Sequence, residues 1–421
     1  MFGNPLREST LSRIFVLCAV IVAQKFLPTE FSSPLFVLLG LLIMAFGRIQ
    51  RSNFKLVWPL LGVLTIGLIG VFDHESLHII RDISFALTPV ALIFIGSWIA
   101  SSRDMWPLIL KIMVFLGFAF ALIHLSVFVQ DPELLSYKAV DVRRIAGTTG
   151  DLVALAFLLG LFQKRFGIKD LFPKQIPHFI IMLVLFASFV LSYSRTELAV
   201  AIILSFALWG LVSKIKIRMV LAISMLIACF FAIAMTTPTD DIKTFRGKLV
   251  RSVTEITISD YQGMSDIHHN WRGYETYRAL ASFSSVNVLQ QIFGQGFGAV
   301  TDLGLYMNLG GEDFRYIPIF HNGYAYILVK TGLLGLACYA FFYINVIRIT
   351  LCNTNSLINE QKFLARLLLG CVLSLIFTMS VVGGMAQMHN SEFVLLLGYL
   401  VRQIGQSQAD ENQIGVVRIS R

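Results

Sequence analysis

The side chains best suited to chemistry in this sequence are one histidine and a few arginines, each beside a long apolar run. His321 stands in Phe320-His321-Asn322-Gly323-Tyr324, where a long polar segment returns to an apolar one. A neutral imidazole at such a boundary could take a proton from an attacking hydroxyl group, as a general base with a near-neutral pKa does. The alternative is an interfacial histidine that precedes a helix capped by Asn322.

The arginines occur at three places near the apolar runs. Arg143 and Arg144 precede one run, Arg195 lies in the short turn Ser194-Arg195-Thr196 between two runs, and Arg272 lies in the polar segment. A guanidinium group binds two phosphate oxygens at once and stays charged in a low-dielectric site, so it suits a pyrophosphate. The alternative for Arg195 is that it pairs with Glu197 or a lipid phosphate and only anchors the turn.

Two histidine patterns resemble metal sites. His74-Glu75-Ser76-Leu77-His78 fits the zinc pattern H-E-x-x-H, but it occupies a short connector with no evident third ligand downstream. His268 and His269 are adjacent, so they would point apart on a helix. We therefore expect no metal and no cofactor. The glycines from Gly294 to Gly298 follow no strand, which favours a tight turn over a nucleotide-binding loop.

The composition defines the elements that must position these residues. Hydrophobic residues make up 56% of the 421 and charged residues only 14%, whereas soluble domains contain about 25% charged residues. This composition predicts an all-α polytopic membrane protein with about twelve spans. The predicted spans are 11–27, 33–47, 57–72, 84–100, 107–129, 150–163, 178–193, 197–213, 219–236, 321–349, 365–383 and 392–401.

The distribution of basic residues predicts the orientation. The 34 Lys and Arg against 25 Asp and Glu are interpreted as topology-setting charge at helix ends, and no nucleic acid is expected. Most of them fall in the connectors that are inside if the N-terminus is cytoplasmic, so both termini are predicted to be cytoplasmic. The few in short outside connectors are candidates for function. They are Lys25, Arg81, Lys138, Arg143, Arg144 and Arg195.

This topology divides the chain into five predicted parts. Residues 1–130 hold five helices, 131–236 hold four helices with the outside arginines, and 237–320 form one large extracytoplasmic loop. Residues 321–402 hold the last three helices, and 403–421 form a cytoplasmic tail. All the candidate residues are predicted to face the side of the large loop.

Taken together, these residues resemble the O-antigen ligase and polymerase superfamily of bacterial envelope glycan transferases. The resemblance covers roughly residues 140–340 and depends on the order and spacing of several motifs. These are Arg144-x-x-Gly147, the Ser194-Arg195-Thr196 turn, Arg272 followed by aromatic residues, Gly294-x-Gly296-x-Gly298, and His321-Asn322-Gly323-Tyr324 running into Lys330-Thr331-Gly332-Leu333-Leu334-Gly335.

The resemblance implies a metal-independent glycosyltransferase in the bacterial inner membrane, with a periplasmic active site. Its donor would be a glycan on undecaprenyl pyrophosphate, and its acceptor a lipid A core for a ligase or a lipid-linked repeat unit for a polymerase. Arg195 and Arg272 would hold the pyrophosphate, Arg144 or Arg143 would assist, and His321 would activate the acceptor. The alternative from another class is a transporter or flippase of lipid-linked glycans, although the sequence shows no repeated halves.

Overall fold

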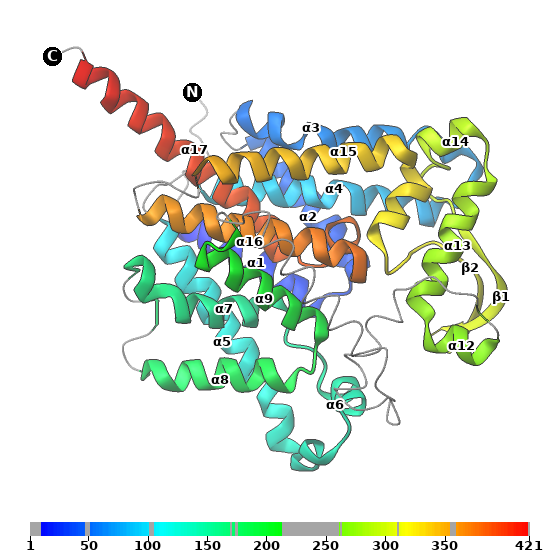
Figure 1. Cartoon of the computed structure of the whole chain (residues 1–421), viewed down its shortest axis with the longest axis horizontal. Coiled ribbons are helices and arrows are strands. Elements are labelled where there is room, and N and C mark those ends of the chain that lie inside the picture. The colour runs from blue at the N-terminus through cyan, green and yellow to red at the C-terminus, as the bar shows by residue number, and fades with distance from the viewer. Residues whose placement is uncertain are drawn as a thin grey trace. The chain divides into compact units, whose positions relative to one another are not determined.

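The computed structural model describes residues 10–46, 51–100, 105–168, 171–172, 176–212, 261, 263–309, 311–353 and 359–419. The predicted span 219–236 and most of the first third of the predicted large loop lie outside these residues. The elements keep the labels of Figure 1.

The described chain is mostly helical (Figure 1). The first half contains α1 (Thr10–Phe26), α2 (Thr29–Phe46), α3 (Arg51–Gly67), η1 (Val71–Asp73), α4 (Ser76–Ile99), α5 (Trp106–Gln130), η3 (Pro132–Ser136), α6 (Ala139–Ala146), α7 (Asp151–Phe162), η4 (Gln163–Phe166), α8 (His178–Leu191) and α9 (Arg195–Trp209). The second half contains α12 (Met264–His269), α13 (Trp271–Ser285), α14 (Val288–Phe293), β1 (Thr301–Leu309), β2 (Glu312–Ile317), α15 (Gly323–Asn353), α16 (Asn359–Val382), η6 (Gly384–Gln387) and α17 (Ser391–Ile419).

Among the described residues, five helices are long and apolar enough to cross a membrane: α2, α4, α5, α15 and α16. They agree with a polytopic membrane protein. The other predicted spans outside 219–236 also fall on helices, but α1, α3, α7, α8 and α9 are shorter than these five. Helix α17 continues through the predicted tail to Ile419. The total of twelve spans and the five-part division remain predictions.

The helices belong to two compact units. The first consists of residues 1–102, 258–352 and 371–421, and α4 is its central helix, packed by α2, α3 and α17. Small residues allow the close approach of these helices. A Cβ atom on Gly96 would collide with the Leu395 carbonyl, and one on Gly398 would collide with backbone atoms of Ile93.

The second unit consists of residues 103–257 and 353–370. Helix α7 is its centre and packs against α5, α8 and α9. Nearly every residue of α7 is buried, as expected for a helix that is apolar on all sides. Gly117 of α5 lies against Ala156 of α7, where a Cβ atom would come within 2.6 Å of the alanine methyl carbon.

The all-α prediction missed a β-hairpin in the large loop. Strands β1 and β2 pair antiparallel, with Leu309 opposite Glu312 and an irregularity between Asp302 and Met307. Two residues, Gly310 and Gly311, separate the strands in the sequence, which is a recognised hairpin signal. The hairpin packs on α13. There the Tyr274 hydroxyl donates to the Leu303 carbonyl at 2.5 Å.

The predicted turn at Gly294–Gly298 is confirmed, and it fits into a break in α15. The break is at Gly332, whose φ is 65° and ψ −166°. The carbonyls of Val329 and Lys330 accept hydrogen bonds from the amides of Gln295 (2.9 Å) and Gly296 (3.0 Å). A side chain at Gly294 would collide with the Lys330 carbonyl. Backbone groups that a regular helix would satisfy internally are therefore satisfied by the turn.

Candidate functional site

The centre of the candidate site is a hydrogen-bonded pair formed by His321 and Glu275. His321 Nδ1 lies 2.7 Å from Glu275 Oε2, and the His321 backbone amide donates to the same oxygen at 3.2 Å. Because a carboxylate can only accept, Nδ1 carries the hydrogen in this contact. In the neutral ring, Nε2 then has the free lone pair. The Glu275 side chain is 5% exposed and the His321 side chain 45%, so the imidazole is accessible while its carboxylate partner is shielded.

Two elements hold this pair in place. Glu275 lies on α13, one turn after Arg272, so both side chains lie on the same side of that helix. His321 lies just before α15. Asn322 caps that helix, since its Oδ1 accepts from the amides of Tyr324 (3.0 Å) and Ala325 (3.2 Å). The expected capping role of Asn322 is therefore present together with the His321–Glu275 pair.

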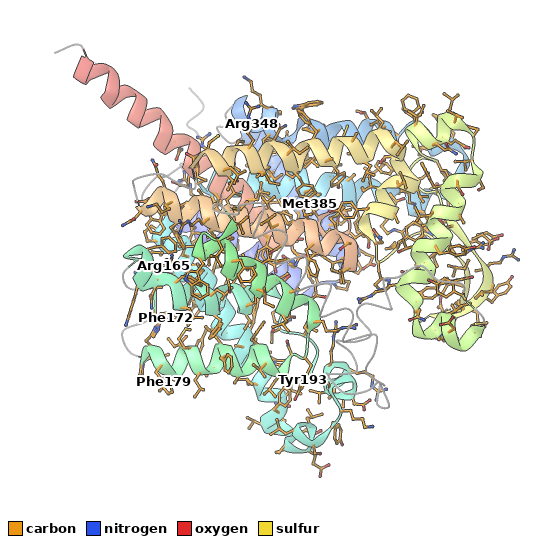
Figure 2. All side chains as sticks on the ribbon, viewed as in Figure 1. Arg165, Phe172, Phe179, Tyr193, Arg348 and Met385 are labelled. Atoms are coloured by element: carbon orange, nitrogen blue, oxygen red, sulfur yellow. The ribbon has the colours of Figure 1, made fainter. Side chains whose placement is uncertain are left out.

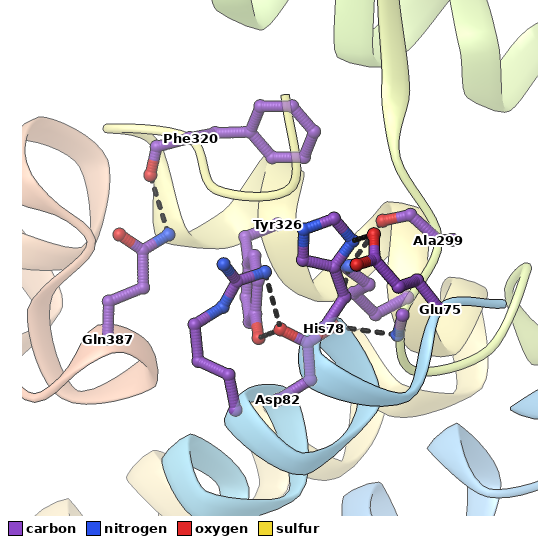
Figure 3. Close-up of polar contacts among 10 residues, drawn as sticks. Glu75, His78, Asp82, Ala299, Phe320, Tyr326 and Gln387 are labelled. Carbon is purple, nitrogen blue, oxygen red and sulfur yellow. Dashed lines mark hydrogen bonds and ion pairs between the residues drawn. The ribbon is translucent and has the colours of Figure 1, made fainter. Parts of the chain in front are cut away.

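A third element, the turn between α16 and α17, is attached to the peptide that carries His321. The Gln387 amide donates to the Phe320 carbonyl at 2.6 Å (Figure 3). Gly323 is so close to Gly383 that a Cβ atom would come within 2.6 Å of its carbonyl oxygen. The turn also carries His389. Although solvent reaches this ring, desolvation by the surrounding protein lowers the pKa of His389 to about 4, and the nearby Arg272 guanidinium lowers it further.

A buried ion pair lies about two helical turns into α15. Lys330 Nζ lies 2.6 Å from Asp82 Oδ2 of α4, and both side chains are fully buried. Asp82 also accepts from the Tyr326 hydroxyl (2.9 Å) and from the Gly298 amide (2.8 Å) (Figure 3). Lys330 donates to the Ala299 carbonyl as well. The cluster thus joins α4 and α15 to the end of the glycine turn.

The other candidate arginines lie in the second unit, where two predicted motifs come together. Val142 and Ala146 of α6, the helix of Arg143 and Arg144, pack in one cluster with Tyr193 of the α8–α9 turn; Tyr193 is labelled in Figure 2. Arg144 is exposed, and its Nη2 lies 3.7 Å from Asp141 Oδ1.

Glu197 connects the same two motifs through hydrogen bonds. Its carboxylate accepts from the Thr149 hydroxyl (2.8 Å) and the Gly150 amide (3.0 Å). The Ser194 hydroxyl caps α9 by accepting from the Glu197 amide at 3.3 Å. Arg195, the first residue of α9, is half-buried. The structure therefore brings Arg143, Arg144 and Arg195 into one region of the second unit, and Arg272 and His321 into one region of the first.

The H-E-x-x-H pattern does not form a metal site. Helix α4 begins at Ser76, so His74 lies before the helix and cannot share a face with His78. The His74 ring is used instead in a 2.8 Å hydrogen bond to the Gln295 carbonyl. No cluster of three or more potential metal ligands occurs among the described residues.

Sequence reasoning missed three residues of these clusters. Glu275 follows Arg272 by three residues in the sequence, and this spacing was the available signal. Asp82 follows the outside arginine Arg81 directly. His389 had no signal, because it lies in a connector without helical periodicity.

The comparisons with known proteins agree with the predicted resemblance. Residues 180–340 match the model of a family described as O-antigen ligase. This segment includes Arg195, Arg272, Glu275 and His321. No curated protein matches the chain. The match confirms the resemblance to the O-antigen ligase and polymerase superfamily, and it supports a role in polysaccharide assembly.

Proposed function

We propose that this chain, as a relative of the O-antigen ligases, transfers a glycan from undecaprenyl pyrophosphate to a sugar hydroxyl during surface polysaccharide assembly. The observation that carries the proposal is the His321–Glu275 pair, an accessible imidazole held by a shielded carboxylate beside Arg272. Such a pair is suited to remove a proton from a hydroxyl group.

In the proposed reaction, His321 Nε2 takes the proton of the acceptor hydroxyl as its oxygen forms a bond to the anomeric carbon of the donor. The bond from that carbon to the pyrophosphate oxygen breaks, and the lipid pyrophosphate leaves with the electron pair. Its negative charge requires stabilisation. Arg272 and Arg195 supply guanidinium groups for this purpose, and Arg144 or Arg143 assists. Glu275 stabilises the positive charge that develops on the imidazole.

The site is proposed to face the periplasm, with both termini in the cytoplasm of a bacterial inner membrane protein. The support for this orientation is the distribution of basic residues among the connectors. The lipid-linked donor would then be presented from the outer leaflet, and no metal ion would be required. The acceptor is either a lipid A core, which defines a ligase, or a lipid-linked repeat unit, which defines a polymerase.

The test is transfer by the purified protein in EDTA, with each acceptor offered separately. We expect transfer by the wild type, a loss of about 10²- to 10⁴-fold in His321→Ala, and a strong loss in Arg195→Ala. The acceptor that is used distinguishes ligase from polymerase. Full activity in both variants would refute the assigned roles. Folded wild-type protein that transfers to neither acceptor would instead favour the transporter or flippase.

A further inference from the structure

His389 is presented toward solvent by an unusual backbone. The residues on both sides of it, Met388 (φ 64°) and Asn390 (φ 63°), adopt the left-handed conformation, which only three non-glycine residues do in the described part of the chain. Met388 and Asn390 are buried, whereas His389 is exposed. A left-handed methionine is disfavoured and persists only where its surroundings hold it, a situation that is frequent at functional sites.

The turn between α16 and α17, which carries His389, is bound to the segment around His321. The Gln387–Phe320 hydrogen bond and the close contact of Gly383 with Gly323 connect it to the residues on either side of His321. His321 and Arg272 both lie close enough to the His389 ring to affect its protonation. His389 therefore lies close to the His321–Glu275 pair and to the arginine proposed to hold the pyrophosphate.

The protonation state of the His389 ring determines which kind of ligand group it can bind. With a pKa of about 4, His389 is neutral near pH 7, so it has one donor and one acceptor nitrogen. A sugar hydroxyl has one donor hydrogen and two acceptor lone pairs, so it can either donate to the free ring nitrogen or accept from the ring N–H. A phosphate would favour an imidazolium, which the nearby Arg272 opposes.

We propose that His389 binds the acceptor sugar through a hydrogen bond to one of its hydroxyls and thereby positions the attacking hydroxyl for His321. This inference rests on the proposed glycan transfer. It places the turn between α16 and α17 on the side of the site that binds the acceptor. Arg272 and Arg195 remain on the donor side.

The experiment measures steady-state transfer by the full-length protein in detergent, with the donor and the acceptor varied separately. Losing one hydrogen bond to the acceptor should raise its KM about tenfold in His389→Ala. We expect the donor KM to stay within about twofold. His389→Gln and His389→Asn each place an amide near one ring nitrogen, so one of them should recover part of the acceptor affinity.

The matched control is His178→Ala, which removes an exposed histidine at the start of α8 in the other unit and should change neither KM. An unchanged acceptor KM in His389→Ala, or a rise in the donor KM alone, would overturn the inference while leaving the proposed function intact. An unchanged donor KM also shows that the variant is folded. A wild type without transfer activity would refute the proposed function, and this inference with it.

Discussion

Replacing Glu275 by glutamine should reduce turnover about 10- to 100-fold. Glutamine has nearly the same shape and can still accept from His321 Nδ1, so the ring should keep its orientation. It cannot offer a negative charge to the imidazolium that forms as the proton is taken. A hydrogen bond to a charged group contributes about 1.5–3 kcal/mol, and each 1.36 kcal/mol corresponds to a factor of ten in rate. The 2.7 Å contact and the burial of Glu275 justify this range.

The assay is single-turnover transfer with saturating donor and acceptor, which reports the chemical step. In a double-mutant cycle, His321→Ala combined with Glu275→Gln should be no slower than His321→Ala alone, because Glu275 acts through the histidine. The control is Glu312→Gln, which changes an exposed glutamate of β2 in the same unit. Multiplying effects in the double variant, or full activity in Glu275→Gln, would refute the reasoning.

Three further predictions concern stability and the donor. Lys330→Met removes the nearest cation from the buried Asp82 carboxylate and leaves it with Arg81, whose Nη2 lies 3.6 Å from Asp82 Oδ1, so it should cost up to about 3–5 kcal/mol of unfolding free energy; adding Asp82→Asn should recover part of this loss in denaturant titrations, and no recovery would contradict the pairing. Arg195→Lys keeps the charge but loses the planar fork, so the donor KM should rise about tenfold, with the acceptor KM as the internal control. His389 has a folded pKa of about 4 against about 6.5 when unfolded, so the unfolded chain binds more protons between these values, and stability should fall as the pH drops through this window; thermal unfolding at pH 7 and pH 5 should show a smaller loss in His389→Gln than in the wild type.

The long apolar runs were sufficient to predict the helices, because a chain in a lipid environment must satisfy its backbone within each segment. The run at 107–129 corresponds to α5 within one residue at each end, whereas α4 begins at Ser76, eight residues before the predicted run 84–100. The hairpin was missed for a different reason. Its alternating pattern from Thr301 and the Gly310-Gly311 pair are visible in the sequence, but the all-α prediction was based on the composition and the long apolar runs, to which this segment contributes little.

The candidate site was predictable only in part. His321 and the arginines could be recognised, because each combines a reactive group with a position at the edge of an apolar run. The partner of His321 could not, since Glu275 precedes it by 46 residues, and periodicity contains no information on such distant contacts. His74 shows the opposite failure, in which a motif is present without its site. The H-E-x-x-H pattern specifies only residue types, and the helix that would align its two histidines begins two residues after His74.

The interrupted α15 has a consequence for the assembly of the protein during its synthesis. Residues 294–298 leave the ribosome before Gly332, and the two carbonyls that they satisfy belong to Val329 and Lys330, which are synthesised later. If the loop is not yet docked, a broken helix would leave these carbonyls without partners in the lipid, so a continuous helix is then the favoured state. The bend would therefore arise late, as the loop docks. A broken α15 therefore indicates that the segment 294–298 has docked on it, and a continuous α15 indicates that it has not.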